Sequence, residues 1–118
     1  MEAHIEQVIE FLRAAKLNFE NGLYEVSAFL AEEALHLYLV LSCLKHNVEV
    51  PWYADFDSLL RILERYEPEF KEIRKEKAMI KFFDEIRIKF RYSVPMKIDK
   101  ETAEKVISFA ESIIKLNL

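Results

Sequence analysis

The sequence predicts an all-α fold, an antiparallel up-and-down four-helix bundle with one extra short helix between the second and fourth long elements. One glycine and three prolines among 118 residues leave little material for turns, which favours long helices over a sandwich or barrel. Apolar residues recur at helical spacing along the chain. Hydrophobic residues make up 52% and charged residues 32%, as in a compact protein with a buried core. We therefore expect a single domain over residues 1–118.

The bundle is organised around the segment 22–46, which is apolar at almost every position from Val26 to Leu44. A helix that is apolar on all sides must be surrounded by other helices or by lipid. Polar residues interrupt the run, so no unbroken apolar span of about 20 residues remains. These residues are Glu25, Glu32, Glu33 and His36. We expect a buried central helix and no membrane association.

The first helix should run from about Glu2 to Asn21 and pack beside the central helix. Its apolar stripe consists of Ile5, Val8, Leu12, Ala15 and Phe19. Gly22 can adopt the left-handed conformation that ends a helix. Because the connection is so short, the first two helices should be antiparallel neighbours.

The second half of the chain should contain three further helices. A loop around Trp52 comes first, and we expect this side chain to cover the core; the alternative is a role in stacking on a ligand. Either Asp55 or Asp57 caps the short third helix, and Pro68 breaks it. The fourth helix begins somewhere between residues 69 and 77 and ends at residue 91. A final helix follows, capped by Asp99.

The usual catalytic and metal-binding signatures are absent from the sequence. A single glycine excludes a phosphate loop or a dinucleotide fingerprint. The histidines lack metal-ligand spacing, and Glu-x-x-His occurs once, at 33–36, where a di-iron bundle needs it twice. We expect no metal and no cofactor. The lone Cys43 and the polar N-terminus predict a cytoplasmic protein, and abundant Lys, Glu, Ile and Phe with one glutamine suggest a thermophile.

The formal net charge of −4 conceals a basic segment at residues 71–91, with eight basic and four acidic residues. Local positive charge on an acidic protein can mark a surface for phosphate or polyanions. The alternative is a solvated helix face with ion pairs, and we favour it for an overall acidic chain.

One candidate site lies on the central helix, where Glu32 and His36 are four residues apart and share a face with Glu25. A neighbouring carboxylate favours the imidazolium form. In that form His36 could serve as a proton donor or an anion ligand near neutral pH. The alternative is a half-exposed polar pair at the bundle edge, which we favour over a functional site.

The second candidate site lies at the end of the fourth helix, where Arg87 and Arg91 are four residues apart and Tyr92 follows. Two guanidinium groups on one face suit phosphate binding. Alternatively, the helix dipole favours these cations, and Asp84 pairs with Arg87.

Several of these segments resemble the HEPN domain (higher eukaryotes and prokaryotes nucleotide-binding). The resemblance covers about residues 5–114. It rests on the turn at 22–24, on Ala28-Phe29-Leu30-Ala31-Glu32-Glu33-Ala34, and on Arg91-Tyr92 before a proline-containing turn. It implies an up-and-down bundle, usually a homodimer, that binds a nucleotide or partners a small, separately encoded nucleotidyltransferase, often in a toxin–antitoxin pair. The residues carried over are Arg91 and Tyr92, with Glu32 and His36 on the facing helix, whereas Arg87 rests on spacing alone.

The chain departs from this family pattern at several positions. His36 stands where many members carry glutamate, Val40 where they carry lysine, and Ser93 where proline follows Arg-Tyr. Ribonuclease members use an arginine followed four to six residues later by histidine. Neither Arg87 nor Arg91 meets this pattern, since the last histidine is His46. The resemblance therefore does not extend ribonuclease activity to this chain.

Three functional hypotheses follow. The first is a non-catalytic binding module, with Arg87, Arg91, Tyr92, Glu32 and His36 at its site. The second is a metal-independent ribonuclease, in which His36 acts as general base and Arg91 holds the scissile phosphate, so that both must converge. The third is a purely structural dimeric bundle. Nine phenylalanines and five tyrosines in a small bundle also predict an apolar patch for a homodimer.

Overall fold

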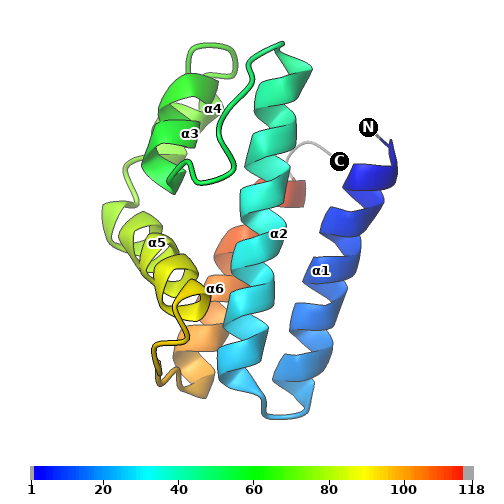
Figure 1. Cartoon of the computed structure of the whole chain (residues 1–118), viewed down its shortest axis with the longest axis vertical. Helices are drawn as coiled ribbons and strands as arrows, with labels where there is room; N and C mark the ends of the chain where they lie inside the picture. Colours follow the sequence, from blue (N-terminus) through cyan, green and yellow to red (C-terminus); the bar gives the residue numbers. More distant parts are fainter. Residues whose placement is uncertain (1, 116–118) are drawn as a thin grey trace.

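The computed structural model describes residues 2–115 and contains, within that range, six helices and no strand. The helices are α1 (Glu2–Glu20), α2 (Tyr24–Lys45), α3 (Phe56–Leu63), α4 (Glu69–Ile73), α5 (Lys77–Arg91) and α6 (Lys100–Lys115). The long helices alternate in direction, with α1 and α5 running one way and α2 and α6 the other (Figure 1). The predicted all-α antiparallel bundle is confirmed.

The structure has two short helices between α2 and α5, where the sequence predicted one. The segment 69–91 bends at residues 74–76, where Lys75 and Glu76 donate backbone hydrogen bonds to carbonyls only three residues back. In one straight helix, Phe70 and Phe83 would point about 140° apart at 3.6 residues per turn. Both side chains are fully buried. The bend allows both to face the core.

The helix α2 lies at the centre of the molecule, and α1, α3, α5 and α6 all pack against it. In Figure 1, α1 lies on one side of α2, α3 and α5 lie on the other, and α6 lies behind it. Among the described residues, α2 is the one helix long and apolar enough to cross a membrane by length and composition. Inside the protein, however, 67% of the apolar 18-residue stretch of this helix is buried. This burial is typical of a central bundle helix.

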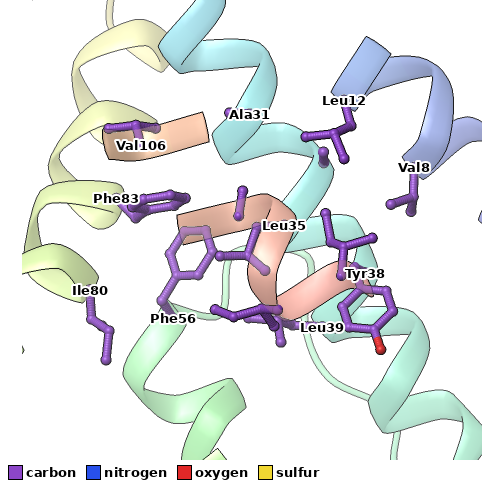
Figure 2. Close-up of a cluster of buried hydrophobic side chains, with 14 of the residues drawn as sticks. Val8, Leu12, Ala31, Leu35, Tyr38, Leu39, Phe56, Ile80, Phe83 and Val106 are labelled. Atoms are coloured by element: carbon purple, nitrogen blue, oxygen red, sulfur yellow. The ribbon is translucent and has the colours of Figure 1, made fainter. Parts of the chain in front are cut away.

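The core is made by alanines and leucines of α2 and by aromatic side chains from the second half of the chain. Ala28, Ala31 and Ala34 are fully buried, and such small side chains let neighbouring helices approach closely. Figure 2 shows Phe56 and Phe83 near Leu35 of α2. The rings of Phe56 and Phe83 meet edge to face, with centroids 5.4 Å apart.

Local signals in the sequence set the helix ends. Gly22 has a φ of 77°, as expected for the residue that separates α1 from α2. Asp55 caps α3, because its Oδ1 accepts the Ser58 N–H at 2.8 Å. Asp99 accepts the Thr102 N–H at 2.8 Å at the start of α6. The Asp55 cap fixes where the loop at residues 46–55 rejoins the bundle.

Candidate functional site

The polar strip of α2 fastens this helix to the second half of the chain. Glu25 Oε2 accepts the Ile98 N–H at 3.1 Å, near the start of α6. Glu32 pairs with Arg87 of α5, and His36 Nε2 lies 2.8 Å from the Ala54 carbonyl oxygen. The strip therefore has a structural role along its whole length.

Arg87 joins α5 to two adjacent carboxylates of α2. Its Nη1 donates to Glu32 Oε2 at 2.9 Å and to Glu33 Oε1 at 3.0 Å. The Glu32 side chain is fully buried and that of Arg87 is 16% exposed. The sequence offered Asp84 as a partner of Arg87, and this alternative is wrong, because Arg87 pairs with Glu32 and Glu33. Asp84 Oδ1 accepts the Phe56 N–H at 3.0 Å instead.

Burial dominates the electrostatics of this pair. The pKa of Glu32 is raised from 4.5 to about 8, chiefly by desolvation; the Arg87 guanidinium offsets part of this rise, and the neighbouring Glu33 carboxylate adds to it. Glu32 Oε1 and Arg87 Nε are buried and have no hydrogen-bond partner in the described part of the chain. The pair is therefore costly to bury and is sensitive to protonation of Glu32.

His36 does not carry the charge that the sequence predicted. The pKa of His36 is lowered from 6.5 to about 4, chiefly by burial and also by the nearby Arg87 and Arg91, while the hydrogen bond to Ala54 opposes the shift. Because the pKa of Glu32 is about 8, this carboxyl is mostly protonated near pH 7 and does not supply the negative charge that was expected to favour the imidazolium. Near pH 7 the imidazole is neutral, and its Nε2–H donates to Ala54, which leaves Nδ1 unprotonated.

An open cleft of about 310 Å³ lies outside this buried pair. Its lining comes from α1, α2, α5 and the loop after α2, and comprises Gln7, Phe11, Glu33, His36, Leu37, Val40, Trp52 and Arg87. The walls are therefore mainly apolar, with a few polar groups that converge, as is common in ligand sites.

Trp52 stands at the cleft with 67% of its surface exposed. The prediction that Trp52 covers the core is wrong, because Phe56 of the following helix, 1% exposed, fills the core there. The guanidinium carbon of Arg91 lies 4.6 Å from the centroid of the Trp52 ring, in a cation–π contact. Trp52 thus forms part of the cleft wall, and Arg91 contacts the ring of this residue without lining the cleft itself.

The structure brings together four of the five residues singled out from the sequence. His36 and Arg87 line the cleft, Glu32 is buried beneath it, and Arg91 contacts the lining residue Trp52. Tyr92 does not line the cleft and is 70% exposed. Whether these residues bind a ligand remains a prediction.

Sequence reasoning missed Glu33 as a cleft residue, and it ranked a ligand-stacking role of Trp52 below a role in covering the core. The sequence signal for Trp52 was its place in a Pro-Trp-Tyr loop, because a side chain in a loop is not required to fill the core. For Glu33 the signal was adjacency to Glu32, since neighbouring helix positions point about 100° apart and one arginine can bridge both. Within residues 2–115, no cluster of three or more His, Cys, Asp or Glu residues could hold a metal ion.

Comparison with known proteins identifies the family. The HEPN domain matches the chain across residues 1–118. No curated protein and no solved structure matches the chain significantly. The chain therefore belongs to the HEPN domain family.

Proposed function

We propose that this HEPN domain is a binding module whose cleft takes a nucleotide, with the base against Trp52 and a phosphate at Arg91. The observation that carries this proposal is the Arg91 guanidinium stacked 4.6 Å from an exposed tryptophan beside a cleft of about 310 Å³. Aromatic rings and guanidinium planes both stack on nucleobases. A tryptophan left 67% exposed in a small bundle offers such a surface.

The charges around the cleft support this assignment. Arg91 forms no ion pair within the described residues, so its charge is available to a phosphate, whereas Arg87 Nη1 already binds Glu32 and Glu33. In this proposal Arg91 contacts the phosphate directly. Arg87 contributes positive potential from the cleft floor and holds the facing helices together.

A partner protein is the second candidate for the same surface. The side chains of Trp52, Tyr53 and Tyr92 are 67%, 65% and 70% exposed. Exposed aromatic residues and arginine are enriched in protein interfaces. The resemblance stated above names the partner as a small nucleotidyltransferase, as in a toxin–antitoxin pair, and includes assembly of the domain as a homodimer.

The site chemistry gives less support to the ribonuclease alternative. His36 and Arg91 do approach the same cleft, as that mechanism requires. However, a pKa of about 4 makes His36 a weak base near neutral pH. We therefore place binding ahead of cleavage.

The nucleotide proposal can be tested through Trp52, the only tryptophan in the chain. Mononucleotides and dinucleotides are titrated while intrinsic fluorescence and binding heat are recorded. We expect saturable quenching in the wild type and an affinity at least about tenfold lower in Arg91→Ala, because a charge-assisted contact is lost. Arg65→Ala, at an exposed arginine outside the cleft, serves as the matched control and should bind like the wild type.

The absence of heat and quenching with every nucleotide tested would refute nucleotide binding. The partner candidate is then tested by co-purification with a nucleotidyltransferase encoded beside this gene. Trp52→Ala should weaken that complex, and an unchanged complex in both Trp52→Ala and Arg91→Ala would refute the assigned surface.

A further inference from the structure

A second depression, separate from the cleft, lies where α3 and the turn after α4 meet the start of α5. Its volume is about 360 Å³. The charged residues that line it are Asp57, Arg61, Arg74, Lys77, Lys81 and Asp84. Cations outnumber carboxylates by four to two. It shares no lining residue with the cleft at Trp52.

The two arginines of this basic pocket are already held in place by acidic groups. Asp57 accepts from Arg61 Nη2 at 2.9 Å and from Arg74 Nε at 3.2 Å. Glu64 accepts from Arg74 Nη1 at 2.8 Å. These bonds fix one wall of the pocket and neutralise much of its charge.

Lys77 and Lys81 differ from the arginines because neither forms an ion pair within residues 2–115. Both side chains are exposed, and they are four residues apart in the first two turns of α5. Like charges at this spacing repel. The positive end of the helix dipole also disfavours cations there, and α5 has no acidic residue in its first turn. Glu76 at the N-cap and Asp84 in the pocket reduce this repulsion without pairing with either lysine, and an anion between the two lysines would relieve the rest.

Asp84 is the one carboxylate of the pocket that faces no arginine at hydrogen-bond distance. Its Oδ1 is occupied by the Phe56 N–H at 3.0 Å. Burial raises the pKa of this carboxyl from 3.8 to about 6, so its negative charge is weakened in mildly acidic solution. Asp84 therefore opposes an anion in the pocket less than an exposed carboxylate would.

We propose that this basic pocket is a phosphate-binding site in which Lys77 and Lys81 contact the phosphate oxygens. The ligand is either a free phosphate or a phosphate of a nucleic acid strand, since both present the same charged oxygens. Lys81 and Arg91 are ten residues apart on neighbouring faces of α5, which is about 15 Å along the helix. Lys81 therefore lies well apart from the arginine that the proposed function assigns to the cleft. The pocket does not depend on nucleotide binding at Trp52.

The test compares two double variants of the full chain that remove equal charge. Lys77→Gln/Lys81→Gln alters the pocket. Lys97→Gln/Lys100→Gln is the matched control, because both of its lysines are exposed and Lys100 also begins a helix. Inorganic phosphate and a short oligouridylate are titrated by calorimetry at constant ionic strength. Circular dichroism confirms that each variant is folded.

We expect the pocket variant to lose at least about tenfold in affinity and the control to stay close to the wild type. Loss for inorganic phosphate identifies a free-phosphate site, and loss for the oligouridylate alone identifies a strand phosphate. Equal losses in both double variants would show general charge attraction and overturn the proposal, as would no binding of either probe.

Discussion

We expect the wild-type protein to lose stability as the pH rises above neutral. Replacing Glu32 by glutamine should remove this loss. Glu32 is fully buried against Arg87, and burial raises its pKa to about 8. In the unfolded chain the same carboxyl titrates near its ordinary value of 4.5. Between these values the folded protein binds more protons than the unfolded chain. The free energy of unfolding must therefore fall as the pH rises through this window.

The size of the effect follows from the two pKa values. For a single group with these values, the free energy of unfolding falls by about 1.4 kcal/mol between pH 7 and pH 9. This interval avoids most of the titration of Asp84, whose pKa is raised to about 6, and of His36, whose pKa is lowered to about 4. The thiol of Cys43 also titrates differently on unfolding, but equally in both proteins.

Urea denaturation followed by circular dichroism at pH 7, 8 and 9 measures this slope directly. Glutamine has the shape of glutamate and can still accept from Arg87, so Glu32→Gln should lose less stability with pH than the wild type. Glu72→Gln, at a carboxylate with a 73% exposed side chain, is the control and should keep the wild-type slope. Parallel slopes for Glu32→Gln and wild type would refute the argument that burial governs Glu32.

Three further outcomes can be measured by the same denaturation method. As the pH falls from 6.5 to 4, the stability of His36→Gln relative to the wild type should rise by about 3 kcal/mol, because the unfolded chain protonates His36 near pH 6.5 and the folded protein only near pH 4; a stability difference that does not change with pH would count against it. Arg87→Met should cost about 3 kcal/mol at pH 9 and less at pH 6, where Glu32 holds a proton; a loss independent of pH would contradict that account. Phe83→Ala should cost about 4 kcal/mol, whereas Ile88→Ala, at a 58% exposed side chain, should stay within about 0.5 kcal/mol; similar losses would mean that Phe83 is not in the core.

The helix ends were predictable because they depend on local chemistry. Gly22 separates the first two helices, and Asp55 and Asp99 cap α3 and α6 through hydrogen bonds to residues three positions away. Such signals act over a few residues, and they therefore appear in the sequence itself. The apolar surface of α2 likewise showed that other helices must cover it.

The partners of the polar residues were not predictable from spacing. Spacing placed Arg87 and Arg91 on one face, but only the packing of α5 against α2 directs Arg87 to Glu32 and Arg91 to Trp52. The two contacts join residues 55 and 39 positions apart in the sequence. A difference of one helical turn decides which arginine reaches the buried carboxylate.

Composition and periodicity by themselves determined that this chain forms an antiparallel helical bundle around its second helix. The tertiary structure decided the charge states of Glu32 and His36, the exposure of Trp52 and the location of both anion-binding candidates. The physical reason is that a pKa and an exposed surface depend on what surrounds a side chain in three dimensions. Helix formation and capping depend chiefly on neighbours along the chain.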